Sequence, residues 1–431
     1  MSTMKKEIVM LKKAPAYRFV VFILMALCYV LVYAGTQTFA ALAGDIMNSV
    51  GIGAGKMSLL SSIGTLAMAI FSFFAGVFMG KFGGKKVIIG GLLVMALSGV
   101  LYLTNPASEA LLYLFRIIQG FGCGATNSAL MALVSVWFPS NERGMAQGIL
   151  SCFYGASVSV GTFYVFLCKD MAWYQTMGYL FLGGGVIFAL LILFFYKDIE
   201  KAHGVSIIDE AIEGYTAGTA TPVAGQEAKS AFHKAKNWSE ALKSPAFWLT
   251  GIMMFFYCSS CYGTAFVFPL FLTGSGLDAA ASTSVMSLGS ISTILFCLVG
   301  GVLSDKLFHS KRTPVTMMAF GGSAIFFTII ALVIHSVPIG ALIALYFIAF
   351  GLLNFAGGPA WALPAEVVAP EFAQQNTGNC LLFANIGGFI MTTVAGILME
   401  NVSVAAGFIC IIACQVMVFV LALLLRLKCK V

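Results

Sequence analysis

The sequence predicts an all-α polytopic membrane protein with twelve transmembrane helices in two pseudo-symmetric six-helix bundles. Its composition is the first reason: 60% of the 431 residues are hydrophobic and only 10% are charged, whereas soluble domains contain about 25% charged residues. The second reason is that apolar stretches long enough to cross a bilayer, which takes about 20 residues per helix, recur along the whole chain. The third is a short motif that occurs once in each half.

Twelve apolar stretches are the predicted spans. They cover approximately residues 17–42, 57–79, 86–104, 110–137, 145–168, 175–196, 246–273, 281–304, 315–336, 339–364, 376–399 and 404–426. The first follows basic residues, as a signal peptide would, but it is longer than the roughly 7–15 apolar residues of such a peptide. We therefore expect a retained first span.

The basic residues predict the topology. If the N-terminus is cytoplasmic, all Lys and Arg except Lys56, Lys169 and Arg116 fall in or beside cytoplasmic segments. Positively charged loops favour the cytoplasmic side, so both termini are predicted to be cytoplasmic. This topology explains the formal net charge of +7, which requires no nucleic-acid partner.

The repeated motif predicts two related halves. Gly76-Val-Phe-Met-Gly80-Lys81 follows the second span, and Gly301-Val-Leu-Ser-Asp305-Lys306 follows the eighth. Internal repeats of this kind are typical of membrane transporters. We predict an N-terminal six-helix bundle at 1–196, a central cytoplasmic linker at 197–245 and a C-terminal six-helix bundle at 246–431. The linker is expected to be flexible, with its charges on a solvated face.

Arg116 is the basic residue that lies inside a predicted span. A cation at the centre of a span costs roughly 2.5–3.5 kcal/mol on insertion scales, so such a side chain faces protein or a water-filled cavity. One interpretation is that Arg116 binds an anion through a two-pronged hydrogen bond. The alternative is a snorkelling or structurally paired arginine, about two turns from the helix start. Asn127 lies within about 20° of the same helix face, so we expect both residues to line one cavity wall, with Gly120 leaving room between them.

Polar and aromatic residues in other spans are further candidates for a substrate cavity. They are Tyr29, Tyr33 and Gln37 in the first span, Tyr154 in the fifth, Tyr257 and Tyr262 in the seventh, Asn354 and Trp361 in the tenth, and Asn385 in the eleventh. Each has a structural alternative, which is core packing, interfacial anchoring of a tyrosine or a helix–helix hydrogen bond of an asparagine. Pro269 and Pro359 predict a bent or irregular helix in the seventh and tenth spans.

The twelve spans, the long central segment and the Gly-x-x-x-Asp-Lys pattern resemble the major facilitator superfamily over essentially the whole chain. Phe115-Arg116-x-x-x-Gly, followed by Trp137-Phe-Pro-x-x-Glu-Arg-Gly, is similar to its anion:cation symporter group. That group carries organic acids such as sugar acids, aromatic acids and glutamate. The resemblance implies substrate contacts for Arg116, Tyr33, Trp361 and Asn385.

The resemblance also implies a cytoplasmic gate. We assign to it the charged residues that follow the second, fourth and eighth spans: Lys81, Lys85, Glu142, Arg143, Asp305, Lys306 and Arg312. The sequence departs from the family pattern at three places. Gly80 stands where the first copy of the motif has Asp, Gly35-Thr36 where several members have Asp-Arg, and Cys123 where many have a proton-coupling Glu.

Several functional classes are not expected. The sequence has no Walker-type phosphate loop, so direct use of ATP is not predicted. It has no dense His/Cys/Asp/Glu group, so neither a metal nor a cofactor is predicted. The sequence also shows no nucleophile–base pair of the kind that would indicate an enzyme. No Asp or Glu lies in the middle of a span, and an intramembrane base without an acid favours an anionic ligand over a cation.

We therefore predict a secondary active transporter that moves a small organic anion, a carboxylate, by alternating access. The mode is symport, anion exchange or uniport, with a proton, a sodium ion or a counter-anion as the second solute. We expect a monomer surrounded by membrane lipid, in the cell membrane and by resemblance in a bacterial inner membrane. One alternative is an efflux carrier for a neutral or amphipathic metabolite, with Arg116 structural. Another is a transport-like sensor that binds its ligand without flux.

Overall fold

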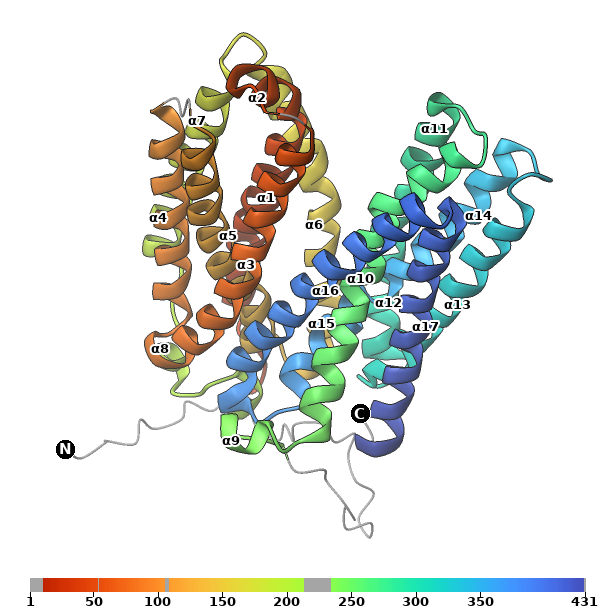
Figure 1. The fold of residues 1–431 in the computed structure, drawn as a ribbon. Coiled ribbons are helices and arrows are strands. Elements are labelled where there is room, and N and C mark those ends of the chain that lie inside the picture. Colours follow the sequence, from red (N-terminus) through yellow and green to blue (C-terminus); the bar gives the residue numbers. More distant parts are fainter. Residues whose placement is uncertain (1–10, 53, 105–107, 213–233, 430–431) are drawn as a thin grey trace. The chain divides into compact units, whose positions relative to one another are not determined.

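The structure is a computed structural model that describes residues 11–52, 54–104, 108–212 and 234–429. Within these ranges the regular elements are all helices, and extended pairing is limited to two isolated bridges (Figure 1). A helix satisfies its backbone hydrogen bonds within one segment, which the hydrocarbon core of a membrane requires. The predicted all-α polytopic fold class is confirmed.

The chain divides into two compact units, which are not continuous in sequence. Unit 1 comprises Met1–Ser140, Phe153–Val223 and Pro370–Leu382. Its elements are α1 (Tyr17–Ala41), α2 (Ala43–Val50), α3 (Ala54–Phe82), α4 (Gly84–Leu103), α5 (Glu109–Trp137), the later part of α6 (Ser140–Leu167), α7 (Trp173–Phe195), α8 (Ile199–His203), η1 (Ile208–Ala211), η2 (Pro370–Phe372) and the start of α16 (Ala373–Asn401). Helix α5 packs against α1, α3 and α4, and α7 packs against α1 and α4.

Unit 2 comprises Asn141–Cys152, Ala224–Ala369 and Phe383–Val431. Besides the early part of α6 and the later part of α16, its elements are α9 (Trp238–Ala241), α10 (Pro245–Gly274), α11 (Ala279–Ser290), α12 (Ser292–Lys306), α13 (Arg312–Val333), α14 (Ile339–Phe355), α15 (Gly357–Glu366) and α17 (Val404–Cys429). Helix α17 packs against α10 and α13, while α14 packs against α11, α12 and α13.

Eleven helical segments in the described ranges are long and apolar enough to cross a membrane. They match all the predicted spans except 145–168, which lies within the 28-residue α6. The eighth predicted span is divided at Ile291 and the tenth at Ala356. Pro269 lies inside α10, which continues to Gly274. The tenth span is therefore irregular as expected, whereas proline does not interrupt the seventh.

The central linker is more ordered than the sequence suggested. Its first part forms α8 and η1, in which Ile199, Ile208 and Asp209 are buried. Asp209 accepts a hydrogen bond from the backbone N–H of Ser140 at 3.2 Å. The expectation of a solvated linker face is therefore wrong for these residues, because isoleucines between the charges give the segment an apolar side. The Gly/Thr-rich stretch predicted to be flexible, 214–225, lies outside the described residues.

Candidate functional site

Arg116 lies on α5, the most enclosed of the candidate spans: 83% of the residues in its most apolar 18-residue stretch are buried. Its side chain is only 3% exposed. The guanidinium donates from Nε to the carbonyl of Leu60 at 3.3 Å, from Nη2 to the carbonyl of Ser61 at 3.3 Å, and from Nη1 to Oε1 of Gln119 at 2.8 Å. Its Cζ atom also lies 3.9 Å from the ring centre of Phe39 on α1, a cation–π contact.

The charge of Arg116 has no acidic partner in the part of the chain that the structure describes. All three of its hydrogen-bond acceptors are neutral oxygens. A guanidinium has five N–H donors, and these bonds use one donor from each of its three nitrogens. The surroundings of Arg116 thus orient the side chain but leave its positive charge uncompensated.

Gly64 on α3 makes room for this guanidinium. A Cβ atom at Gly64 would lie 2.8 Å from Nη2 of Arg116. Gly120 has a different role from the one predicted, because a Cβ there would lie 2.8 Å from the Cβ of Ala67. Gly120 therefore permits close packing of α5 on α3, and the expectation that it leaves cavity space is wrong.

Asn127 is completely buried, and neither its amide nitrogen nor its amide oxygen has a hydrogen-bond partner among the described residues. The predicted structural alternative, a helix–helix hydrogen bond, is therefore not formed in this structure. Asn127 lies eleven residues beyond Arg116, about 16 Å along the helix axis at about 1.5 Å per residue. Because helical side chains tilt toward the N-terminus, Arg116 points further away from Asn127. One small anion is therefore too short to contact both at the same time.

Three of the predicted tyrosines form a cluster in unit 1. The ring centres of Tyr29 and Tyr33 are 4.8 Å apart, and those of Tyr33 and Tyr154 on α6 are also 4.8 Å apart. Gln37, one turn after Tyr33, is half-buried. Phe39, the ring beneath Arg116, follows Tyr33 by six residues and so lies about 120° around α1 at 100° per residue. The tyrosine cluster and Arg116 therefore contact different faces of α1.

The predicted residues of unit 2 form two pairs. Tyr257 on α10 and Trp361 on α15 have ring centres 5.9 Å apart in an edge-on arrangement. The hydroxyl of Tyr262 donates to Oδ1 of Asn385 on α16 at 3.5 Å. Asn354 instead uses its side-chain amide to donate to the carbonyl of Phe350, one turn back on α14, at 2.8 Å. The sequence could not distinguish these arrangements, because all five residues occupy apolar helices.

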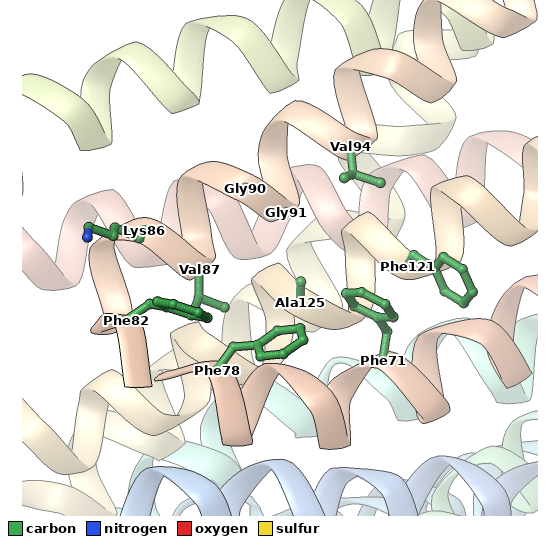
Figure 2. A pocket seen from close by; sticks show the side chains of 10 residues that line it. All are labelled: Phe71, Phe78, Phe82, Lys86, Val87, Gly90, Gly91, Val94, Phe121 and Ala125. Atoms are coloured by element: carbon green, nitrogen blue, oxygen red, sulfur yellow. The ribbon is translucent and has the colours of Figure 1, made fainter. Parts of the chain in front are cut away.

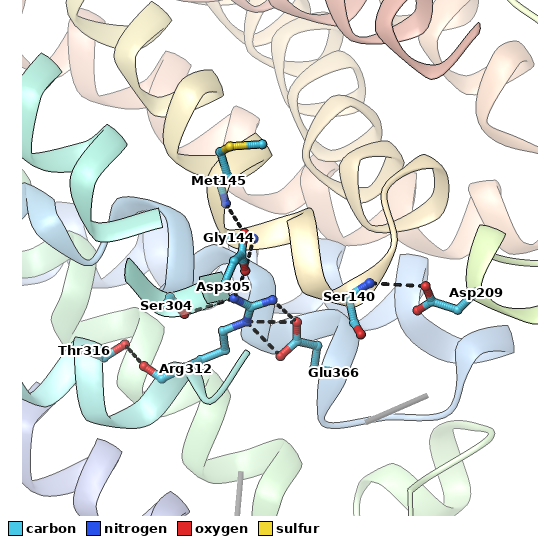
Figure 3. A network of polar contacts seen from close by, with 9 residues as sticks. All are labelled: Ser140, Gly144, Met145, Asp209, Ser304, Asp305, Arg312, Thr316 and Glu366. Atoms are coloured by element: carbon cyan, nitrogen blue, oxygen red, sulfur yellow. Dashed lines mark hydrogen bonds and ion pairs between the residues drawn. The ribbon is translucent and has the colours of Figure 1, made fainter. Parts of the chain in front are cut away.

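The second copy of the repeated motif builds a buried ion network in unit 2 (Figure 3). Arg312, fully buried, forms ion pairs with Asp305 and Glu366. Its Nε donates to the two carboxylate oxygens of Glu366 at 3.0 and 3.2 Å. Asp305 also accepts from the backbone N–H groups of Gly144 and Met145, at 3.2 and 2.7 Å, in the first turns of α6. A helix N-terminus stabilises a carboxylate in this position.

The first copy of the motif has a different arrangement in unit 1. Gly76 packs on the start of α16, where a Cβ would lie 3.0 Å from the carbonyl oxygen of Gln375 and 3.1 Å from Cα of Gly378. At Gly80 the side chain of Gln375 fills the position that a carboxylate would occupy. The loss of the acid predicted from Gly80 is therefore accompanied by a neutral amide packed in its place.

The remaining predicted gate residues differ in exposure. Lys81 and Lys306 are exposed at the ends of α3 and α12, Glu142 is half-buried, and Arg143 is 3% exposed. Lys85 donates from Nζ to the carbonyls of Leu193 and Tyr196 at 2.7 and 2.8 Å. A lysine in this place stabilises the C-terminal end of a helix, here α7.

Sequence reasoning missed partners of Arg116 and of Arg312. Neither Glu366 as a partner of Arg312 nor Gln119 and Phe39 as partners of Arg116 were predicted. Glu366 lies 54 residues from Arg312, so no local spacing could connect them. Gln119 offered a signal, because it stands three residues after Arg116 and thus on the same side of the helix.

The long apolar helices of both units define a polytopic membrane protein. No group of three His, Cys, Asp or Glu side chains in the described ranges is arranged to hold a metal ion. The sequence profile described as Major Facilitator Superfamily matches residues 25–392. The chain belongs to this superfamily, and it is a transporter rather than an enzyme.

Related proteins and structures agree with this assignment. A probable sulfoacetate transporter, SauU, of Cupriavidus necator is 25% identical over 391 residues, which cover 88% of this chain and 86% of that protein. The probable galactarate/D-glucarate transporter GudP of Escherichia coli is 21% identical over 412 residues, 91% and 89% of the two chains. The crystal structure of the superfamily transporter FucP in the outward conformation aligns with a TM-score of 0.69 at 14% identity, covering 95% of this chain and 99% of that one. The predicted resemblance to the anion:cation symporter group is confirmed by these relatives.

Proposed function

We propose that this protein is a secondary active transporter that moves a small organic anion across the membrane by alternating access, with Arg116 as the anion-binding group. The contrast between two buried arginines carries the proposal. Arg312 is paired with two carboxylates, whereas the acceptors of Arg116 within the described ranges are neutral oxygens. An uncompensated guanidinium inside a membrane helix is unfavourable on its own, and binding an anion removes that penalty.

The relatives support the chemical class of the substrate. Sulfoacetate, galactarate and D-glucarate, which appear in the names of the related transporters, all carry at least one carboxylate. A carboxylate binds a guanidinium through two parallel hydrogen bonds. Coupling then uses a proton, a sodium ion or exchange for a counter-anion. No Asp or Glu lies in the middle of a span, which favours a proton carried on the substrate or an exchange of anions over a titrating carboxylate.

The remaining residues have roles in the same proposal. In unit 1 the substrate contacts are Arg116, Tyr29, Tyr33, Gln37, Asn127 and Tyr154, and in unit 2 they are Tyr257, Tyr262, Asn354, Trp361 and Asn385. The cytoplasmic gate comprises Lys81, Lys85, Glu142, Arg143, Asp305, Lys306 and Arg312. We further propose two bundles at 1–196 and 246–431 joined by the linker 197–245. The protein is proposed to act as a monomer in a bacterial inner membrane, with both termini cytoplasmic.

One observation favours a second candidate. The guanidinium of Arg116 is 3% exposed and already makes three hydrogen bonds, which suits a structural arginine. In that case the protein is an efflux carrier for a neutral or amphipathic metabolite. A ligand sensor without flux is the third candidate, and only a transport measurement separates it from a carrier.

The test combines ligand-dependent stability with flux. The purified protein is heated in detergent with a panel of monocarboxylates, aldarates and sulfonated carboxylates, and the acid that stabilises it is then used for uptake into proteoliposomes. A ligand at 100 times its Kd stabilises the folded state by about 2.7 kcal/mol. The variants are Arg116→Ala, Arg116→Lys and, as the matched control, Arg426→Ala, which removes an exposed arginine from the last turn of α17.

We expect one acid to stabilise the wild type and Arg426→Ala, but not Arg116→Ala. Arg116→Lys should bind it at least tenfold more weakly, because lysine keeps the charge and loses the planar fork. If Arg116→Ala responds like the wild type, Arg116 is structural and the efflux alternative applies. If the acid binds but is not transported, the sensor interpretation replaces that of a carrier.

A further inference from the structure

An apolar groove in unit 1 has no place in the proposed transport cycle. It is formed by α3, α4 and α5 and has a volume of about 270 Å³ (Figure 2). Its walls are phenylalanine rings from α3 and α5, together with Val87 and Val94 on α4. Apart from Lys86 at one end, the residues that line the groove are apolar side chains and glycines.

The aromatic wall is continuous along the groove. Phe71, Phe78 and Phe82 are seven and four residues apart, which places them on one face of α3. The rings of Phe71 and Phe121 are stacked with centres 4.7 Å apart, and the ring centres of Phe78 and Phe82 are 6.1 Å apart. Phe82 remains 55% exposed. A chain of rings with open faces offers contact to a long, flexible apolar molecule.

Two adjacent glycines on α4 form the other side. Gly91 is required for packing, since a Cβ there would lie 2.9 Å from the backbone nitrogen of Thr126 on α5. A Cβ at Gly90 would have no atom within 4 Å. The groove at Gly90 is therefore open space and is not occupied by a neighbouring side chain.

The polar end of the groove carries a positive charge. Lys86 is exposed, and no hydrogen bond or ion pair engages its ammonium group within the described chain. The neighbouring Lys85 is used by the end of α7. Lys86 lies at the start of α4, at the membrane surface that the charge distribution predicts to be cytoplasmic.

We propose that this groove binds one acyl chain of an anionic phospholipid, with the phosphate of the headgroup at Lys86. From Lys86 to Val94 the groove runs along eight residues of α4, about 12 Å at about 1.5 Å per residue. One leaflet of the hydrocarbon core is about 15 Å deep, half of roughly 30 Å. The groove thus has the polarity and the length of a lipid in one leaflet, with its charge at the surface and its apolar part inward.

Other occupants fit less well. A small soluble anion would find a cation at Lys86 but only apolar walls beyond it. A helix of another protein is about 10–12 Å wide with its side chains. A cylinder of that width over the length of the groove would have several times the groove volume of about 270 Å³. Anionic lipid next to an exposed lysine gains about 1 kcal/mol of electrostatic attraction, which distinguishes it from a zwitterionic lipid with the same chains.

The test measures lipid binding to the purified full-length protein in detergent. The probes are dioleoyl phosphatidylglycerol, dioleoyl phosphatidylcholine and glycerol 3-phosphate, followed by thermal stabilisation and by native mass spectrometry of retained lipid. Gly90→Leu fills the groove, and Lys86→Gln removes its charge. Gly183→Leu is the matched control, because Gly183 lies inside α7 and a Cβ there also meets nothing within 4 Å.

We expect the wild type and Gly183→Leu to bind phosphatidylglycerol at least fivefold more tightly than phosphatidylcholine. Lys86→Gln should bind the two lipids equally, and Gly90→Leu should lose the tightly retained lipid. Glycerol 3-phosphate alone should not stabilise any of them. The proposal is overturned if Gly90→Leu and Lys86→Gln both retain phosphatidylglycerol like the wild type, or if the headgroup without chains stabilises as well as the lipid. If Gly90→Leu does not fold, the comparison of phosphatidylglycerol with phosphatidylcholine in Lys86→Gln alone tests the contact between Lys86 and the headgroup.

Discussion

Arg312 and Arg116 show how differently one chain treats two buried cations. Arg312 forms ion pairs with Asp305 and Glu366, and Asp305 also accepts from two backbone amides at the start of α6. Arg116 has carbonyls, an amide and an aromatic ring. The first environment pairs the cation with carboxylates, while the second has no acidic partner among the described residues.

Replacing Glu366 with glutamine should destabilise the protein strongly. The change leaves Arg312 buried with Asp305 as its one remaining carboxylate partner, and breaking a buried ion pair costs about 3–5 kcal/mol. The apparent unfolding temperature in detergent reports the effect. The matched control is Lys56→Gln, which breaks the exposed pair with Glu109; this pair raises the pKa of Lys56, mainly through its hydrogen bond. A control variant as unstable as Glu366→Gln would contradict the ranking by burial.

Replacing Asn127 with leucine should raise stability and lower transport. Its amide is buried without a partner, and removing such a group relieves a desolvation penalty of about 1–3 kcal/mol. The measurements are the unfolding temperature without substrate and the initial rate of uptake. Asn401→Leu is the control, since Asn401 is exposed at the end of α16. A loss of stability in Asn127→Leu would show that the amide is satisfied.

The sequence identified these residues more readily than their surroundings. Arg116 could be singled out because a charge in an apolar span is rare. Helical periodicity also placed Asn127 on the same helix face as Arg116. The periodicity does not give the axial separation of the two residues, which follows from the rise per residue and is about 16 Å. Glu366 could not be assigned to Arg312, because that contact depends on the packing of α13 against α15.

At the scale of helices, neighbouring glycines should respond in opposite ways to substitution. Gly91→Ala should lower the unfolding temperature, because its methyl group would meet backbone atoms of Thr126 and Gly122 at 2.9 and 3.0 Å, and overpacking costs about 1–3 kcal/mol. Gly90→Ala should be neutral or stabilising by up to about 1 kcal/mol, since alanine favours helix and meets no atom. Equal effects at both positions would mean that α4 does not present these two faces.

The starts of α6 and α16 explain why a repeated motif did not predict a repeated structure. Both copies bring a glycine against a helix start, Gly76 against α16 and Gly301 against α6. At the fifth motif position the second copy provides a carboxylate to two backbone amides, and the first provides only space. The sequence showed the departure at Gly80, but the amide of Gln375 that fills it lies almost 300 residues away.

For the whole molecule, the predicted topology leads to a direct test. A fluorescent protein fused after Val431 should fluoresce, and alkaline phosphatase fused there should be inactive, because the charge distribution places the C-terminus in the cytoplasm. Phosphatase fused after Asp170, in the loop between α6 and α7, should be active. The opposite pattern would reverse the orientation and would place Lys86 and its groove on the outer surface.

The transport of an anion proposed for the site at Arg116 has an electrical consequence. Moving one elementary charge across 100 mV changes its free energy by about 2.3 kcal/mol. Entry of a monovalent anion alone into a cell with a negative interior would therefore be opposed, and it would register as an outward current. One-for-one exchange of anions, or entry together with one proton, would carry no net charge and give no steady current. A steady current across the membrane would thus distinguish entry of the anion alone from exchange or entry with one proton.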